Sequence, residues 1–143
     1  MDASDSSSGN SVDGRSSPPL ALRWSTRIGG PALDGARAVA IDAHGDVALG
    51  GFFTYRTTGA ALLEGRPPGT QGFLLMLDGA TGGTRSARIF GDPDTQTVER
   101  VAVVRGPMGP ALAMGGEFVG SFKIGDLPEL AAPTGGTFLL FAR

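Results

Sequence analysis

The sequence contains no cysteine among its 143 residues. Disulfide frameworks, thiolate catalysis and cysteine-ligated zinc are therefore excluded. The absence leaves the compartment open, because a secreted domain with a sufficient core can do without disulfides. Long apolar runs are also missing. The longest, such as "FLLML" at residues 73–77, are far shorter than the roughly 20 residues of a membrane-spanning helix. We expect no transmembrane segment.

Residues that carry common chemistry are also scarce. His44 is the only histidine, and no G-x-S-x-G motif is present, so no Ser/His/Asp set is evident. Eleven of the 12 basic residues are arginines, scattered without interleaved aromatics, which argues against nucleic-acid binding. We therefore expect a protein that is not an enzyme, with no catalytic or metal-binding residues and no cofactor.

Glycine is abundant, and it indicates the fold class. The chain has 24 glycines and 10 prolines, and 41% of its residues are apolar. Short apolar runs separated by glycines predict many short strands joined by tight turns. No segment shows sustained helical periodicity. The sequence therefore predicts an all-β protein.

The first 19 residues differ from the rest. Residues 1–19, "MDASDSSSGNSVDGRSSPP", have three aspartates and one arginine and almost no apolar side chains. Such a segment cannot offset the entropy of ordering, so we expect a flexible tail before a folded part at residues 20–143. It lacks the apolar region of a signal peptide. A tether left after signal-peptide removal, as in a lipoprotein, and a cytoplasmic disordered tail both remain open.

The folded part contains an internal repeat, with units at about residues 22–80 and 83–143. The segment "WSTRIGG" at 24–30 recurs 61 positions later as "RSARIFG", and "VAI" at 39–41 recurs 62 positions later as "VAV". The segments "VALGGFF" at 47–53 and "GFLLML" at 72–77 recur 65 positions later as "LAMGGEF" and "TFLLFA". Between "VAI" and "VALGGFF" the offset grows only at the expected turns, where insertions are tolerated.

Each repeat is predicted to form four antiparallel strands. In the first repeat these are "ARAVAID", "DVALGGFF", "GFLLMLD" and a more polar outer strand, "LRWSTRIG". With the outer strand named D, the chain order is D-ABC-D-ABC. Four antiparallel strands per repeat are typical of a β-propeller blade. We expect the large apolar residues of the B and C strands to be buried: Phe53, Phe73, Leu75, Phe118, Phe138 and Leu140.

The repeat resembles the bacterial SBBP repeat, named for the seven-bladed β-propeller expected of it. The matching residues form a Trp-Ser-x-x-x-Gly-Gly start, an Asp, a Val-x-x-Asp-x-x-Gly turn and two apolar strands: Trp24, Ser25, Gly29, Gly30, Asp34, Val39, Asp42, Gly45, Gly50, Phe53, Phe73 and Leu77. The second copy departs at Arg85, Phe90 and its turn. The resemblance implies β-propeller-like blades and an extracellular or cell-envelope location in bacteria, and no particular reaction. A cytoplasmic location stays open.

Two blades do not close a ring, since propellers have about four to eight. Three arrangements therefore remain open. Three or four copies can assemble into a homo-oligomeric ring, each terminal D strand completing a neighbour. The chain can be a fragment of a longer propeller. Alternatively, it can be a two-sheet sandwich in which the first D strand pairs with the last C strand.

Two acidic stretches are candidates for metal or catalytic sites. Asp42, His44 and Asp46 lie close together, but "DAHGD" between two apolar runs is typical of a hairpin turn, and the second repeat lacks all three side chains. A calcium loop would need more oxygen ligands. Asp92, Asp94 and Glu99 form an acidic loop that is better explained as a solvated connection. We predict that the His44→Ala substitution leaves stability and any binding nearly unchanged.

The glycine pairs and the single tryptophan also have structural explanations. Gly50-Gly51 and Gly115-Gly116 match no phosphate-binding motif, and their recurrence in register indicates close backbone packing or a bulge. Trp24 is a possible sugar platform, but its place in the repeat favours blade packing.

We therefore expect a non-enzymatic scaffold or binding module of a bacterial surface or secreted protein, with an unknown protein or glycan ligand. The alternatives are a glycan-binding lectin made of oligomerised blade pairs and, less favoured, a hydrolase with an acidic pocket.

Overall fold

The structure is a computed structural model, which describes residues 21–142 except 67, 92–93, 107–108 and 125–126. The described part of the chain contains β-strands and no helix, so the predicted all-β class is confirmed. In chain order its strands are β1 (Ile28–Gly29), β2 (Gly35–Ile41), β3 (Val47–Thr54), β4 (Thr58–Gly59), β5 (Thr70–Leu77), β6 (Thr84–Phe90), β7 (Gln96–Gly106), β8 (Gly109–Phe122) and β9 (Leu130–Ala142).

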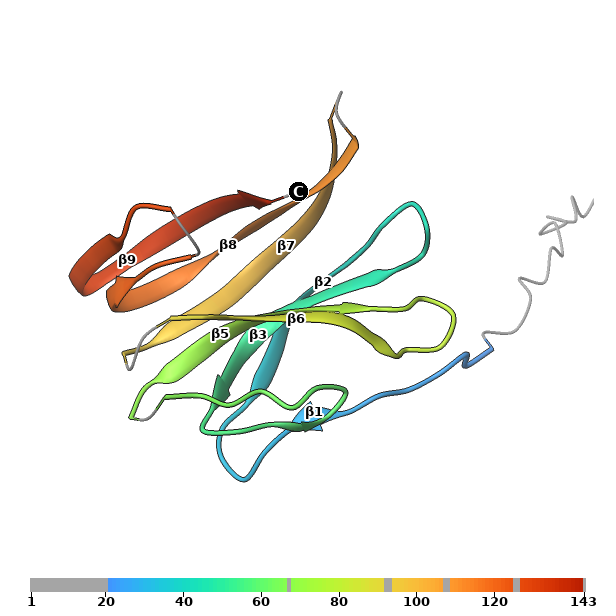
Figure 1. Cartoon of the computed structure of the whole chain (residues 1–143), viewed down its shortest axis with the longest axis horizontal. Coiled ribbons are helices and arrows are strands. Elements are labelled where there is room, and N and C mark those ends of the chain that lie inside the picture. The colour runs from blue at the N-terminus through green and yellow to red at the C-terminus, as the bar shows by residue number, and fades with distance from the viewer. Residues whose placement is uncertain (1–20, 67, 92–93, 107–108, 125–126, 143) are drawn as a thin grey trace, which may run out of the picture.

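Two antiparallel sheets make up most of the molecule (Figure 1). The first sheet has the order β2-β3-β5-β6, and the second has the order β7-β8-β9. Strands β1 and β4 form a separate two-stranded pair. None of these sheets closes on itself. Strand β7 lies against β2, β3 and β5, so the second sheet meets the first mainly along its first strand.

The A, B and C strands predicted for both repeats are confirmed as β2, β3 and β5 and as β7, β8 and β9. The almost wholly apolar β5 runs between β3 and β6, and most of its residues are buried. A strand covered on both faces needs apolar residues at successive positions, which accounts for its sequence. The more exposed β6 is the edge strand of this sheet.

The predicted outer strand at residues 22–29 is wrong for most of its length. Only Ile28 and Gly29 form a strand, and they pair with β4 and not with either main sheet. The fourth strand of the first sheet is instead β6, from the start of the second repeat. The second sheet consequently has three strands in the described part of the chain. Four strands are thus found only in the first sheet, and the fourth comes from the second repeat.

The sandwich in which residues 22–29 pair with β9 is also wrong. The Trp24 indole Nε1 donates a hydrogen bond of 3.0 Å to the carbonyl oxygen of Gly79, and Trp24 and Ile28 pack against an apolar cluster of the first sheet. Burial of these two side chains holds the segment on the first sheet, away from the edge of β9.

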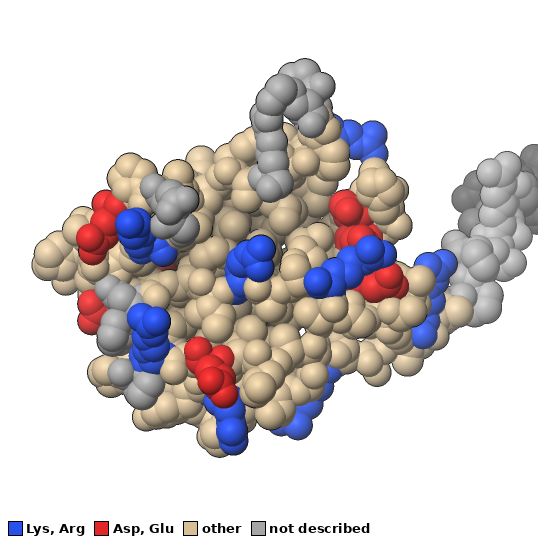
Figure 2. Space-filling model, viewed as in Figure 1, with Lys and Arg blue, Asp and Glu red and all other residues tan. Residues whose placement is uncertain are grey.

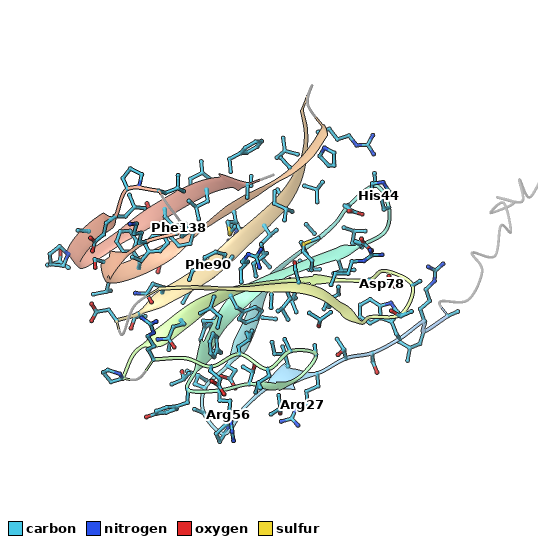
Figure 3. The ribbon with its side chains drawn as sticks, viewed as in Figure 1. Arg27, His44, Arg56, Asp78, Phe90 and Phe138 are labelled. Atoms are coloured by element: carbon cyan, nitrogen blue, oxygen red, sulfur yellow. The ribbon has the colours of Figure 1, made fainter. Side chains whose placement is uncertain are left out.

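The core consists of two apolar clusters. The cluster between the sheets contains Ala48, Leu74 and Phe90 of the first sheet with Val98, Met114, Phe118, Phe122 and Phe138 of the second. Figure 3 shows Phe90 and Phe138 in this space. The other cluster lies on the far face of the first sheet and contains Phe53, Leu63, Phe73, Leu75 and Leu77. Burial is confirmed for five of the six predicted core residues, while Leu140 is half-buried.

Candidate functional site

The Asp42–Asp46 cluster forms the turn between β2 and β3. The Asp42 carboxylate oxygen Oδ1 accepts hydrogen bonds from the backbone N–H groups of His44, at 2.8 Å, and Asp46, at 2.9 Å. The backbone N–H of Asp42 donates to the carbonyl of Asp46, and Gly45 adopts a φ of 89°. An aspartate that binds downstream amides and a glycine with positive φ are the features of a tight turn. The turn interpretation is confirmed.

These hydrogen bonds also affect the ionisation of Asp42. Its pKa is lowered, although the partial burial of the carboxylate acts in the opposite direction. The amides of His44 and Asp46 together outweigh that desolvation because they bind the charged form. The His44 side chain is 77% exposed, and its Nδ1 lies 3.7 Å from Asp42 Oδ2. The imidazole therefore projects into solvent at the rim of the turn (Figure 3).

Asp46 faces a different partner, across the sheet from its own turn. Its Oδ2 lies 3.1 Å from Arg85 Nε, and its Oδ1 accepts a hydrogen bond from the Gly79 N–H. Arg85 Nη2 also contacts Asp78 Oδ2 at 2.7 Å. Arg85 thus joins the β2–β3 turn to the β5–β6 turn.

Asp78 organises the second of these turns. Its Oδ1 accepts hydrogen bonds from the backbone of Ala80 and from the backbone and hydroxyl of Thr81. The pKa of Asp78 is lowered, first by the backbone and hydroxyl bonds of Thr81 and further by the charge of Arg85. The acids at this end of the first sheet thus bind the chain's own amides and Arg85. In the described residues, no group of three or more His, Asp or Glu side chains has the geometry to hold a metal ion.

The second acidic stretch is spread out where it is described. Asp92 lies outside the described residues, Asp94 is exposed, and Glu99 is half-buried in β7. Glu99 lines a groove of about 540 Å³ together with Arg37, Arg100 and Glu117. The groove is bordered by both charges, so it gives no preference for an anion or a cation.

The glycine pairs occupy positions where a side chain would collide with a neighbour. A Cβ atom at Gly50 would lie 2.6 Å from Val98 Cγ1 and 2.9 Å from Val101 Cγ2, both from β7. A Cβ atom at Gly51 would meet the carbonyl oxygen of Gly35, beside the bulge in β2. Close packing and a bulge are therefore confirmed as the roles of this pair.

The second pair repeats only half of this arrangement. A Cβ atom at Gly116 would meet the carbonyl oxygen of Thr97 beside the bulge in β7, as at Gly51. At Gly115, however, the nearest atoms are the Phe138 carbonyl oxygen at 3.2 Å and Leu139 Cδ1 at 3.9 Å, both within the same sheet. Gly50 leaves room for the neighbouring sheet, and Gly115 leaves the same room, although among the described residues no second sheet comes within 4 Å of its Cβ position.

This difference identifies a surface that the local motifs did not reveal. In the first sheet, Ala40, Ala48 and Met76 lie opposite one another on β2, β3 and β5, so their side chains share a face. Gly50 and Leu74 also lie opposite each other, two residues along from Ala48 and Met76, and therefore belong to the same face. We call this the stacking face, because it packs against the second sheet. The offsets of 62 and 65 residues carry its members onto the second sheet as Ala102, Ala113, Gly115, Leu139 and Phe141.

The five equivalent residues form one continuous face of the second sheet. The register places Ala102, Ala113 and Phe141 opposite one another, and Gly115 opposite Leu139. Leu139 is 81% exposed and Phe141 is 57% exposed. We call this the open face. The same face also carries the exposed Arg100, which lies opposite Gly115, and the exposed Glu117, so it is charged at one end and apolar at the other. A solvated sheet face normally carries polar side chains, so the apolar end with Leu139 and Phe141 is typical of a covered surface.

A second exposed apolar feature lies on the opposite side of the molecule. Val39 and Ile41 of β2 are 63% and 65% exposed. They share the far face of the first sheet with the buried Leu75 and Leu77. Their equivalents, Val101 and Val103, are half-buried, and Val101 packs into the cluster between the sheets. We call Val39 and Ile41 the β2 ridge. From the sequence, the open face and the β2 ridge could have been found only by comparing equivalent positions of the two repeats.

Trp24 is not available as a sugar platform in this conformation. Its ring is half-buried, and it covers Gly82, where a Cβ atom would lie 2.7 Å from the indole. Between the sheets, a cleft of about 330 Å³ is lined by Leu74, Met76, Val103 and Leu112, with Asp42 and Arg88 among its polar residues. This cleft is an incompletely filled part of the interface between the two sheets.

The charges on the face shown in Figure 2 give no sign of a polyanion-binding site there. On the face shown in Figure 2, basic and acidic side chains are interspersed, and broad areas carry neither. In the described residues, no helix has the length and hydropathy to cross a membrane. No protein-family model, no curated protein and no solved structure matches this chain.

Proposed function

We propose that the chain is a non-enzymatic β-propeller-type module that acts by stacking and binding through its sheet faces. The observation that carries this proposal is the equivalence of the stacking face and the open face. The first is covered by another sheet of the same chain, whereas the second matches it at five positions and, among the described residues, has Leu139 and Phe141 more than half exposed. A module with such a face acts as a scaffold unit.

The arrangement of the strands supports the β-propeller type. The strands β2, β3, β5 and β6 are consecutive antiparallel neighbours, as in a blade, and β7 begins the next sheet directly after β6. The stacking of β7 on β2, β3 and β5 brings the first strands of two successive sheets together. Propeller blades pack in this order around a central axis. The resemblance to the SBBP repeat points the same way and suggests a bacterial surface or secreted protein.

The side-chain interactions support a function without catalysis. Asp42 and Asp78 each bind backbone amides of their own turn, and Asp46 is paired with Arg85. Carboxylates held in this way have their charges satisfied within the fold. The pKa values of Asp42 and Asp78 are lowered, whereas a general acid that works at neutral pH needs a raised pKa.

A tandem protein tests the repeat-stacking character. Two copies of residues 22–143 joined end to end would place a new first sheet after the open face. If the sheets stack as proposed, the tandem protein unfolds at higher denaturant concentration than the single chain, because stability in repeat arrays includes interface terms between neighbours. The amides of β9 would also exchange more slowly in its first copy. An unfolding midpoint and β9 exchange equal to those of the single chain would contradict the proposal.

A further inference from the structure

We propose that the open face and the free edge of β9 bind a second copy of this chain head to tail. In this contact, residues 23–29 of one copy add to β9 of the other as its fourth strand, and the β2 ridge packs on the open face. The inference rests on the stacking function proposed above and specifies its partner.

The edge of the second sheet has room for this strand. In the first sheet, β6 pairs with β5 and completes four strands, whereas in the described residues β9 has a strand partner only in β8. The repeat equivalent of β6 is the segment at residues 23–29. Within the described chain, no backbone hydrogen bond joins residues 21–26 to a strand, whereas the Arg27 carbonyl accepts one from Ala60 and β1 pairs with β4. The first four residues of the segment, 23–26, are therefore free to form a new ladder.

The register of the new ladder follows from the existing one. In the first sheet, Leu74 lies opposite Arg88, and Leu75 lies opposite Ala87. The offsets of 61 and 65 residues convert these pairs into Arg27 opposite Leu139 and Thr26 opposite Leu140. Arg27 and Leu139 are both exposed, so neither side chain has to leave a core to reach the other.

The faces match in the same alignment. Within one chain, Val98 and Val101 of β7 approach the stacking face at Gly50. In the assembly, Val39 and Ile41 take the places of Val101 and Val103, and Gly115 takes the place of Gly50. The new contact thus continues the established interface between the sheets by one more repeat. It covers Val39, Ile41, Leu139 and Phe141, each more than half exposed in the single chain.

The occupant is a second copy because the two surfaces are complementary and lie on different sheets of one chain. The open face of one copy contacts the β2 ridge of the next, so the two partners use different surfaces. Such an interface is heterologous. Repetition of such an interface closes into a ring if the rotation per copy divides a full turn. Three or four copies would supply six or eight sheets, within the range of about four to eight blades known for propellers.

The experiment measures the mass of the full chain by analytical ultracentrifugation over a wide range of concentrations. We expect the wild type to associate, while Ile41→Glu and Phe141→Glu each remain monomeric, because a charge on either surface blocks the contact. Both positions are exposed in the single chain, so the variants should fold, which circular dichroism would verify. The control is Leu33→Asp, an exposed position where the second repeat already has Asp94, and it should associate as the wild type does.

Mixing the two monomeric variants is the decisive measurement. Ile41→Glu keeps an intact open face and Phe141→Glu keeps an intact β2 ridge, so a mixture should form a dimer and no larger species. A dimer abolished by Phe141→Glu and unaffected by Ile41→Glu would show that two open faces pair, which overturns the head-to-tail contact. A wild type that stays monomeric would overturn it too. If the tandem protein is still stabilised in that case, stacking stands and only its partner is wrong.

The strand register has its own test, which the absence of cysteine makes simple. Mixed Arg27→Cys and Leu139→Cys variants should form a disulfide-linked dimer under mild oxidation. The matched control replaces Arg27→Cys with Thr26→Cys, whose side chain points to the other side of the ladder, and it should give little or no dimer. Equal yields from both mixtures would contradict the register.

Discussion

Gly50 offers the sharpest test of how the two sheets fit together. The substitution Gly50→Ala adds one methyl group, which would lie 2.6 Å from Val98 Cγ1 and 2.9 Å from Val101 Cγ2. Val98 is fully buried, and both valines have stiff side chains, so neither can rotate away easily. The methyl group therefore has to be accommodated by a shift of β7 relative to the first sheet.

The expected magnitude is the difference between two effects. Overpacking of a close-packed core costs about 1–3 kcal/mol. Replacing glycine by alanine in a strand recovers roughly 0.5–1 kcal/mol, because the unfolded chain has less conformational freedom to lose. Both contacts are shorter than 3 Å, so the overpacking cost should lie in the upper part of this range, about 2–3 kcal/mol, and the net loss in the free energy of unfolding should be about 1–2.5 kcal/mol. In urea, with a slope of about 2 kcal/mol per M for a small protein, the midpoint should fall by roughly 0.5–1.25 M.

The matched control is Gly115→Ala, the equivalent position on the open face. Its methyl group would lie 3.2 Å from the Phe138 carbonyl oxygen and 3.9 Å from Leu139 Cδ1, with no sheet above it. In the single chain, the same recovery of roughly 0.5–1 kcal/mol applies and the close Phe138 carbonyl oxygen opposes it, so the free energy of unfolding should stay within about 1 kcal/mol of the wild type and should not fall as it does in Gly50→Ala. Both variants should be unfolded in urea at protein concentrations where the chain is monomeric. If Gly50→Ala is as stable as the wild type, or Gly115→Ala is equally destabilised, the proposed fit of the sheets is wrong.

Three further predictions concern the turns and the core. His44→Ala should leave the free energy of unfolding within about 0.5 kcal/mol of the wild type, since the exposed ring has little to lose; a drop of several kcal/mol would refute this. Phe73→Ala should lower stability by about 3–5 kcal/mol because Phe73 is 1% exposed and packs against Phe53, and a chemical denaturation curve of the variant measures the loss. The lowered pKa values of Asp42 and Asp78 mean that the unfolded state binds protons first, so stability present above about pH 4 should decline as the pH falls through the folded pKa values. The double variant Asp42→Asn/Asp78→Asn should flatten this acid limb in unfolding curves at stepwise lower pH, and an unchanged limb would contradict the role of these two acids.

The sequence was sufficient to predict most of the strands, because their apolar pattern is strong and occurs twice. The buried positions of Phe53 and Phe118 follow from the same alignment. The turn at Asp42 was predictable because its residues form local hydrogen bonds. Local chemistry and periodicity act over a few residues, so a sequence records them directly.

The partner of each edge strand could not be predicted in the same way. Residues 22–29 and β6 have similar sequences, yet only β6 adds to a main sheet. The difference lies at Trp24, whose repeat equivalent is Arg85. The indole of Trp24 packs on the first sheet, whereas the guanidinium of Arg85 pairs with Asp46 and Asp78. Which surface a strand-forming segment joins depends on such long-range contacts, which periodicity does not record.

The open face differs from an ordinary solvent-facing sheet in the distribution of side-chain sizes as well as in polarity. Its small residues, Ala102, Ala113 and Gly115, lie on β7 and β8, and its large residues, Leu139 and Phe141, lie on β9. The covered stacking face has the same gradient, from alanine and glycine on β2 and β3 to Leu74 and Met76 on β5.

On the stacking face this gradient has a clear physical purpose. The alanines and glycine on β2 and β3 leave room for a close approach of β7. The larger Leu74 and Met76 on β5 fill the space between the sheets. A surface exposed to water gains nothing from graded apolar volumes and incurs a risk of non-specific aggregation. The open face retains this gradient at five positions, while Arg100 and Glu117 stand at one end of the face in place of Ala38 and Phe52. The retained apolar gradient is therefore the strongest physical reason to expect that another sheet covers this part of the face.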